Sequence, residues 1–126
     1  MPTKILIVED ETALLYALKA ELSQNDFEVI EAIDGEKGLQ ALEKQIPDII
    51  ILDLLLPGID GFEVLQRIKS KPEMKNIPVI ILTNLGDKES VEKGKKLGAD
   101  DYLIKTDYSL EEVINKLKSL VNKTKK

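Results

Sequence analysis

The segment IIILDLLLPGIDGFE, residues 49–63, gives the strongest indication of the fold. Its first four residues are branched and apolar, which is typical of a strand buried on both faces of a parallel sheet. The strand ends on a carboxylate, Asp53, and the loop after it is leucine-rich up to the turn at Pro57-Gly58. An aspartate at the end of so apolar a strand needs an explanation. In parallel sheets, ligands bind at the carboxyl ends of the strands.

The rest of the chain repeats this strand character at regular intervals, with helical patterns between. The expected strands are Lys4–Val8, Phe27–Ala32, Asp48–Leu52, Ile77–Leu82 and Asp101–Ile104. Strands that alternate with helices predict an α/β fold, a doubly wound five-stranded parallel sheet with helices on both faces. Right-handed crossovers favour the flavodoxin-like strand order 2-1-3-4-5, which places the ligand edge between strands 1 and 3.

Two helical segments have features of their own. The last helix should begin with the capping box Ser109-Leu110-Glu111-Glu112. The helix before it, DKESVEKGKKLG, has a thin apolar stripe, chiefly Val91 and Leu97, and carries Gly94 in its interior. Glycine inside a helix costs roughly 1 kcal/mol relative to alanine, so we expect this helix to be the least stable one.

Composition narrows the possible functions. The 126 residues predict a single domain over residues 1–126, with a core at about 3–122 and a basic C-terminal tail at 123–126. The chain has no cysteine and no histidine, which excludes thiol and histidine catalysis and ordinary zinc sites. A net charge of −5 argues against direct nucleic-acid binding. No stretch approaches a membrane-spanning length or resembles a signal peptide, so we expect no membrane association and a cytoplasmic location.

Polar residues stand at four of the strand ends. Glu9-Asp10 follow the first strand, Asp53 the third, Thr83 the fourth and Lys105 the fifth. Each alone has an ordinary interpretation, such as a helix cap for Asp10 or a surface position for Lys105. Together they would put three carboxylates, a hydroxyl and an ammonium at one sheet edge. Such a set suits magnesium, and a carboxylate beside that cation can accept a phosphoryl group.

The motifs ILIVEDE, IIILDLLLPGIDGFEVL, VIILTN and GADDYLIK carry a family resemblance. In order and spacing, the chain resembles the receiver domain of two-component response regulators over about residues 3–122. The resemblance implies that Asp53 is the phosphoacceptor. It implies a magnesium site made of Asp53, Asp10, Glu9 through water and the backbone carbonyl of Leu55. The leucines after Asp53 would help to shield the acyl phosphate from water.

The resemblance also implies a switch. Thr83 would close on the phosphoryl oxygen, Lys105 would pair with the phosphoryl group, and Tyr102 would turn inward as the threonine moves. The surface of the fourth helix, fifth strand and fifth helix would then change its partner preference. At most, slow self-phosphorylation from small donors and self-dephosphorylation would accompany this signalling role, which is not that of an enzyme.

The partners implied are a sensor histidine kinase or phosphotransfer protein and an unknown downstream protein. The chain would be either a single-domain regulator or a receiver excised from a longer protein with an output domain. It would be a monomer or a weak, phosphorylation-dependent dimer.

Two departures from the family pattern lie at the site. Asn84 follows Thr83, where the family usually has a small residue, which affects the expected lifetime of the phosphorylated state. Thr106 follows Lys105, where the family usually has proline after a cis bond. A cis bond before threonine costs roughly 2.5–4 kcal/mol, so we expect a trans bond here and a lysine that still reaches Asp53.

Alternative functions remain open at this point. A pseudo-receiver would keep the fold as a binding module regulated without phosphorylation, although the full residue set argues against it. A flavodoxin would need a hydroxyl-rich loop where this chain has VEDETALL. A haloacid-dehalogenase-type phosphatase would need an aspartate at the position of Leu55. The sequence also lacks the GxxxxGK[ST] pattern of a nucleotide-binding P-loop.

Overall fold

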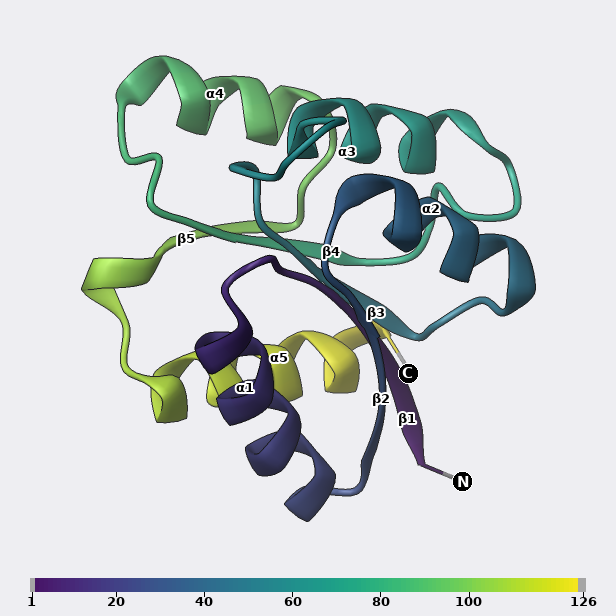
Figure 1. Cartoon of the computed structure of the whole chain (residues 1–126), viewed down its shortest axis with the longest axis vertical. Helices are drawn as coiled ribbons and strands as arrows, with labels where there is room; N and C mark the ends of the chain where they lie inside the picture. Colours follow the sequence, from purple (N-terminus) through teal and green to yellow (C-terminus); the bar gives the residue numbers. More distant parts are fainter. Residues whose placement is uncertain (1, 125–126) are drawn as a thin grey trace.

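Five strands form one twisted parallel sheet with helices on both sides (Figure 1). The structure is a computed structural model and describes residues 2–124. Its strands are β1 (Thr3–Val8), β2 (Phe27–Ala32), β3 (Ile49–Leu52), β4 (Val79–Thr83) and β5 (Asp101–Ile104). Its helices are α1 (Thr12–Gln24), α2 (Gly35–Lys44), α3 (Gly61–Ser70), α4 (Lys88–Lys96) and α5 (Leu110–Thr124), with a 3-10 helix, η1, at Lys105–Asp107.

The strand order is β2-β1-β3-β4-β5 and every pairing is parallel, which confirms the predicted fold class. The order reverses between β1 and β3, so the loops after these two strands run in opposite directions. Val8 at the end of β1 lies beside Leu52 at the end of β3. The next residues, Glu9 and Asp53, are thereby brought to the same point of the sheet edge.

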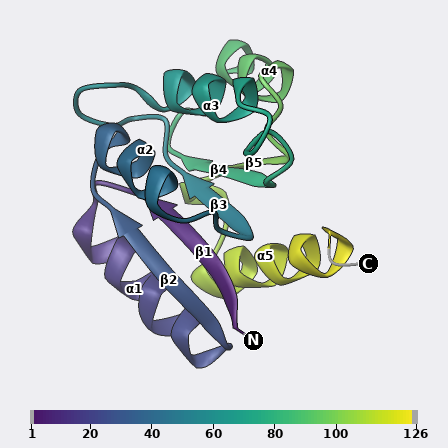
Figure 2. The same ribbon diagram turned by 90° about the vertical axis from the view of Figure 1, so that its right-hand side faces the viewer.

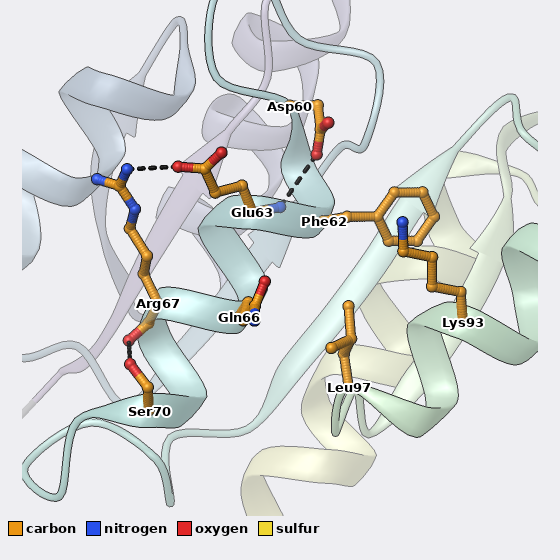
Figure 3. Close-up of a pocket in the computed structure, with 8 residues that line it drawn as sticks. All are labelled: Asp60, Phe62, Glu63, Gln66, Arg67, Ser70, Lys93 and Leu97. Carbon is orange, nitrogen blue, oxygen red and sulfur yellow. Dashed lines mark hydrogen bonds and ion pairs between the residues drawn. The ribbon is translucent and has the colours of Figure 1, made fainter.

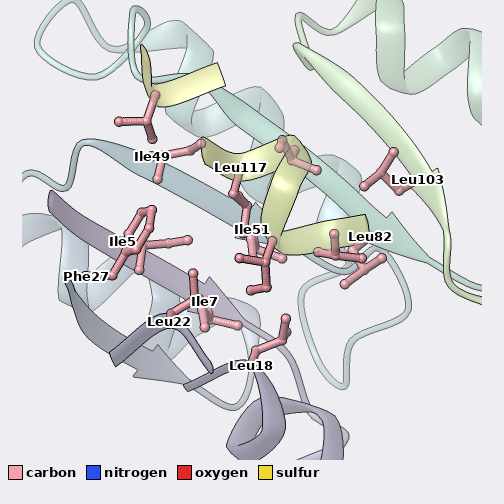
Figure 4. Close-up of a cluster of buried hydrophobic side chains, with 14 of the residues drawn as sticks. Ile5, Ile7, Leu18, Leu22, Phe27, Ile49, Ile51, Leu82, Leu103 and Leu117 are labelled. Atoms are coloured by element: carbon pink, nitrogen blue, oxygen red, sulfur yellow. The ribbon is translucent and has the colours of Figure 1, made fainter. Parts of the chain in front are cut away.

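The sheet divides the apolar core into two clusters. Helices α1 and α5 cover one face, and α2, α3 and α4 cover the other (Figure 1, Figure 2). Figure 4 shows the first cluster, where Leu18 of α1 and Leu117 of α5 meet Ile7 and Ile51 of the strands. Alternate strand residues, among them Leu6, Ile50 and Leu52, face the second cluster. Both clusters need the sheet between them, because each helix buries only one apolar side.

All four residues of β3 are fully buried, at 0% exposure. The run Ile49–Leu52 therefore has helices on both sides, as its unbroken apolar character predicts. Burying each such side chain contributes about 1.5–3 kcal/mol to folding. Asp53 directly follows this buried central strand, which holds its backbone in place.

Caps fix where most of the helices begin. The carboxylates of Asp34, Asp60 and Asp87 each accept a backbone N–H bond of 2.8–3.0 Å from the first turn of α2, α3 and α4. At α5, the N–H of Glu112 donates to Ser109 Oγ at 3.1 Å, and the N–H of Ser109 donates to Glu112 Oε1 at 2.9 Å. This reciprocal pair confirms the predicted capping box.

Several element boundaries differ from those expected. β4 begins at Val79 rather than Ile77, because Pro78 has no N–H to pair and the N–H of Ile77 closes a turn onto Met74. β3 begins at Ile49, one residue after Asp48. α5 continues to Thr124, so the first residues of the expected tail are helical; residues 125 and 126 lie outside the described part of the chain. Within residues 2–124, no helix combines the length and apolarity needed to cross a membrane.

Candidate functional site

Three carboxylates meet where β1 and β3 end. Oxygen atoms of Glu9, Asp10 and Asp53 all lie within 4.8 Å of one another, and we call these residues the acidic cluster. Glu9 and Asp53 are buried, with 1% and 3% of their surface exposed, while Asp10 faces solvent. Asp10 does not cap α1, whose N-cap is Glu11. The cluster is therefore open on the Asp10 side and closed beneath by the sheet.

Asp53 is held by its own loop. Its backbone N–H donates to the carbonyl of Val8 at 3.0 Å, and its Oδ1 accepts from the N–H of Leu55 at 3.1 Å. The side chain of Leu55 points outward and is half exposed, so only its backbone adjoins the carboxylate. Leu54, in contrast, is buried in the core beside α3. The leucine-rich loop thus anchors Asp53 through Leu54 and leaves Leu55 at the surface.

Gly61 is a residue whose role the sequence did not reveal. The sequence presents Asp60-Gly61 as a turn and a helix entry, and Asp60 does cap α3. A Cβ at position 61 would lie 2.3 Å from the carbonyl oxygen of Asp53 and 2.5 Å from Cα of Leu54. Only glycine lets the start of α3 pack this closely against the backbone that carries Asp53.

Lys105, the first residue after β5, reaches into the acidic cluster from the start of η1. Its Nζ lies 2.9 Å from Asp53 Oδ2 and 3.0 Å from Glu9 Oε1, and its side chain is 12% exposed. No peptide bond in residues 2–124 is cis, so the predicted trans bond before Thr106 is confirmed. The lysine reaches Asp53 from this trans backbone, as expected.

Burial affects the pKa values of Glu9 and Lys105. It raises the pKa of Glu9 to about 7, against the opposing effect of the N–H of Glu11, and the charge of Asp53 adds to the rise. Burial alone would lower the pKa of Lys105, but hydrogen bonds to Asp53 and Glu9 outweigh it and raise the pKa above its ordinary value. The ammonium therefore stays charged and partly neutralises the carboxylates around it.

Thr83 and Tyr102 are linked through the peptide groups of Leu85. Thr83 is fully buried, and its Oγ1 accepts the N–H of Leu85 at 3.4 Å. Tyr102 is turned inward at 9% exposure, and its hydroxyl donates to the carbonyl of Leu85 at 2.6 Å. Burial raises the pKa of Tyr102, which keeps this donor protonated. Both side chains thus hold one loop, the segment between β4 and α4.

The interior glycine of α4 has a packing reason. A Cβ on Gly94 would lie 2.9 Å from Cδ1 of Ile81 and 3.0 Å from Cδ2 of Tyr102. The missing side chain lets α4 settle directly onto the tyrosine ring. What weakens α4 as a helix therefore brings it into contact with Tyr102.

A fourth carboxylate, Glu11, also reaches the lysine. Its Oε1 lies 3.3 Å from Lys105 Nζ, and its side chain is 57% exposed. The sequence shows only that a third acid follows Glu9-Asp10, a signal too weak to assign it a position at the site.

The acidic cluster fits a magnesium ion by its donor chemistry. All three residues offer carboxylate oxygens, which hard cations prefer, and the exposed side leaves room for the water ligands that magnesium keeps. Nitrogen or sulfur ligands, which would favour zinc or copper, are excluded by the lack of histidine and cysteine.

A separate hollow lies between α3 and α4 (Figure 3). It has a volume of about 530 Å³ and is lined by six charged or polar residues together with Phe62 and Leu97. Arg67 pairs with Glu63, and Lys93 lies 4.4 Å from the centre of the Phe62 ring. The hollow is separate from the acidic cluster and belongs to the packing of α4 on α3.

The sheet is doubly wound and parallel, and it carries an acidic cluster and a lysine at its switch point. This combination defines a class of signalling domain whose functional site lies at this sheet edge. The chain belongs to the response regulator receiver domain family, whose model matches residues 5–118. Receiver domains are signalling domains of two-component systems.

Relatives support the same assignment. The phosphate regulon transcriptional regulatory protein PhoB of Rhizobium meliloti is 36% identical over 125 residues, which cover 99% of this chain and 55% of PhoB. The chain thus spans about half the length of this curated relative. The receiver domain of Francisella response regulator 1452 has a TM-score of 0.87 at 30% identity, covering 97% of this chain and 98% of that one.

One further structure bears on the metal. The receiver domain of sensor histidine kinase PA1611 from Pseudomonas aeruginosa PAO1 was solved with a magnesium ion coordinated in its active site cleft. It has a TM-score of 0.86 at 26% identity and covers 97% of this chain and 99% of that one.

Proposed function

We propose that Asp53 accepts a phosphoryl group from the phosphohistidine of a sensor histidine kinase or phosphotransfer protein. A carboxylate oxygen of Asp53 bonds to phosphorus, and the P–N bond breaks with its electron pair returning to the imidazole of the donor. Water later attacks the acyl phosphate and releases inorganic phosphate. The observation that carries this proposal is the ammonium of Lys105 at 2.9 Å from Asp53 Oδ2, a buried cation where negative charge would gather.

We assign magnesium to the acidic cluster in this proposal. Asp10 and Asp53 would bind it directly, Glu9 through water, and Leu55 through its backbone carbonyl. When bound, the ion supplies positive charge that neutralises the oxygens of the transferring group. The residues of the chain orient Asp53, exclude water from beneath it and present Lys105.

The switch that we propose starts at Thr83. Its hydroxyl would leave the N–H of Leu85 for a phosphoryl oxygen, and the loop after β4 would shift. Because the hydroxyl of Tyr102 is bonded to the carbonyl of Leu85, the tyrosine and the helix α4 packed on it would respond. The changed surface of α4, β5 and α5 would then alter the affinity for a downstream protein partner.

The experiment is labelling with acetyl phosphate and magnesium. Wild type is expected to gain one phosphoryl group by intact mass, and Asp53→Asn to gain none. Asp107→Asn, an exposed aspartate of η1, serves as the control and is expected to label like wild type. Label that maps to Thr83, or that persists in Asp53→Asn, would overturn the assignment. A folded, unlabelled wild type would favour a pseudo-receiver instead.

A further inference from the structure

Glu11 occupies the N-cap position of α1 but does not cap the helix. Its backbone is extended, as an N-cap requires, yet its side chain accepts no N–H from the first turn. The corresponding carboxylates of Asp34, Asp60 and Asp87 all do so. The side chain of Glu11 is turned instead to Lys105, with Oε1 at 3.3 Å from Nζ. The chain thus gives up a helix cap for a contact with the site lysine.

The contacts of Lys105 use its full donor capacity. An ammonium has three N–H donors, and here Asp53, Glu9 and Glu11 supply the acceptors at 2.9, 3.1 and 3.3 Å. Asp53 and Glu9 approach from the buried side, while Glu11 approaches from solvent. A phosphoryl oxygen that arrives at Lys105 must therefore displace one of these acceptors. Glu11 has the longest contact and the most exposed carboxylate of the three, so it is the one to leave.

We infer that Glu11 is a positioning residue that competes with the incoming phosphoryl group for Lys105 and so slows phosphorylation of Asp53. The inference rests on the proposed function and adds to it a residue outside the acidic cluster. The contact itself, and not only the negative charge of Glu11, causes the competition, because the lysine has no fourth donor. Glu11→Asp keeps the charge but shortens the side chain by one methylene, which separates the two effects.

The test compares Glu11→Ala and Glu11→Asp with wild type at saturating magnesium. The readout is the second-order rate of phosphorylation by acetyl phosphate and by phosphoramidate, which carries less negative charge. Both variants are expected to react roughly two- to fivefold faster with both donors, the range of a partly exposed ion pair. Glu21→Ala removes an equal charge from the distant end of the same helix and is expected to react at the wild-type rate.

The outcomes that overturn the inference are specific. A wild-type rate for Glu11→Asp together with a faster Glu11→Ala would mean that charge alone acts. An acceleration with acetyl phosphate but not with phosphoramidate would lead to the same conclusion. If neither variant is faster, Glu11 does not compete for the lysine. Failure of the proposed function is distinguishable from all of these, because wild type itself would then take no label on Asp53.

Discussion

Glu9 and Asp53 lie side by side because β1 and β3 are neighbours in register, and the buried position of Glu9 makes its charge costly. In the unfolded chain Glu9 would titrate near its ordinary pKa of 4.5, whereas in the fold its pKa is raised to about 7. The fold therefore prefers protonated Glu9. Its favourable contribution is complete below the unfolded pKa and is lost as the pH rises through about 7.

Glu9→Gln is expected to reveal this cost. Without magnesium at pH 8, the variant should be more stable than wild type by on the order of 1–3 kcal/mol, because it removes a buried charge. The difference should shrink as the pH falls below about 7, where Glu9 becomes protonated. Urea unfolding at pH 5.5 and pH 8 measures both quantities. A difference that is the same at both pH values would show that Glu9 does not titrate in this range.

Among single residues, the sequence predicted the positions that follow directly from strand ends. Parallel strands deliver their last residues to one edge, so the meeting of Asp53 with Glu9 and Lys105 could be foreseen from spacing. Gly61 and Glu11 could not be predicted in this way. The first depends on a backbone approach of a few ångströms, and the second on which of two available donors the flexible carboxylate side chain of Glu11 accepts from.

Among the elements, α4 has the least secure attachment to the core. Gly94 is its sole buried residue within residues 88–96. A cation–π contact between Lys93 and Phe62 also connects α4 to α3. α1 and α5, in contrast, insert rows of leucine, isoleucine and valine into the first cluster. We therefore expect faster amide hydrogen exchange in α4 than in α1 and α5. Equal protection of α4 and α5 in a native-state exchange experiment would refute this.

In Gly94→Ala, the gain in helix propensity and the loss of good packing have opposite effects on the free energy of unfolding. Alanine should favour the helix by roughly 1 kcal/mol. The added methyl group, however, meets Ile81 and Tyr102 at 2.9 and 3.0 Å, and overpacking typically costs 1–3 kcal/mol. We expect a net loss of about 1 kcal/mol and a weaker bond from Tyr102 to Leu85.

A double-mutant cycle with Tyr102→Phe measures that weakening. The hydroxyl should contribute less to the free energy of unfolding in the Gly94→Ala background than in wild type. Glu92→Ala, an exposed change in the same helix, is the control for propensity alone and should not lower stability. A Gly94→Ala protein that is more stable than wild type would mean that the ring of Tyr102 yields without cost.

The sequence predicted which segments are strands and helices better than it predicted where they begin and how they pack. Apolar runs located every strand, and the capping box located the start of α5, since these are local properties. The start of β4 was wrong because Pro78 interrupts the pairing of a segment that is otherwise apolar. The purpose of Gly94 was hidden for another reason: it is set by a ring on β5, which lies across the interface from α4.

For the whole molecule, alternation and right-handed crossovers were enough to give the strand order, because few topologies satisfy both. The same topology concentrates negative charge at one edge: among the described residues, three carboxylates contact the ammonium of Lys105, and a fourth, that of Asp10, lies within 4.8 Å of two of them. Like charges held together by a fold reduce its stability. A cation that binds only the folded chain should recover this loss.

Millimolar magnesium is accordingly expected to raise the melting temperature of wild type at pH 8. Asp10→Asn should weaken the shift, because it removes the exposed carboxylate of the acidic cluster. Asp26→Asn, at a loop on the opposite edge of the sheet, should leave the shift unchanged. If wild type melts at the same temperature with and without magnesium, the proposed metal site is wrong.

Both ends of the described chain lie at the sheet edge opposite Asp53, since β1 starts there and α5 runs back to it (Figure 1, Figure 2). A layer of molecules attached to a solid support through either terminus would therefore be oriented. Each molecule would expose the acidic cluster to the solution, and the starts of its strands would face the support. Binding partners flowed over such a chip would encounter the site without steric hindrance from the anchor.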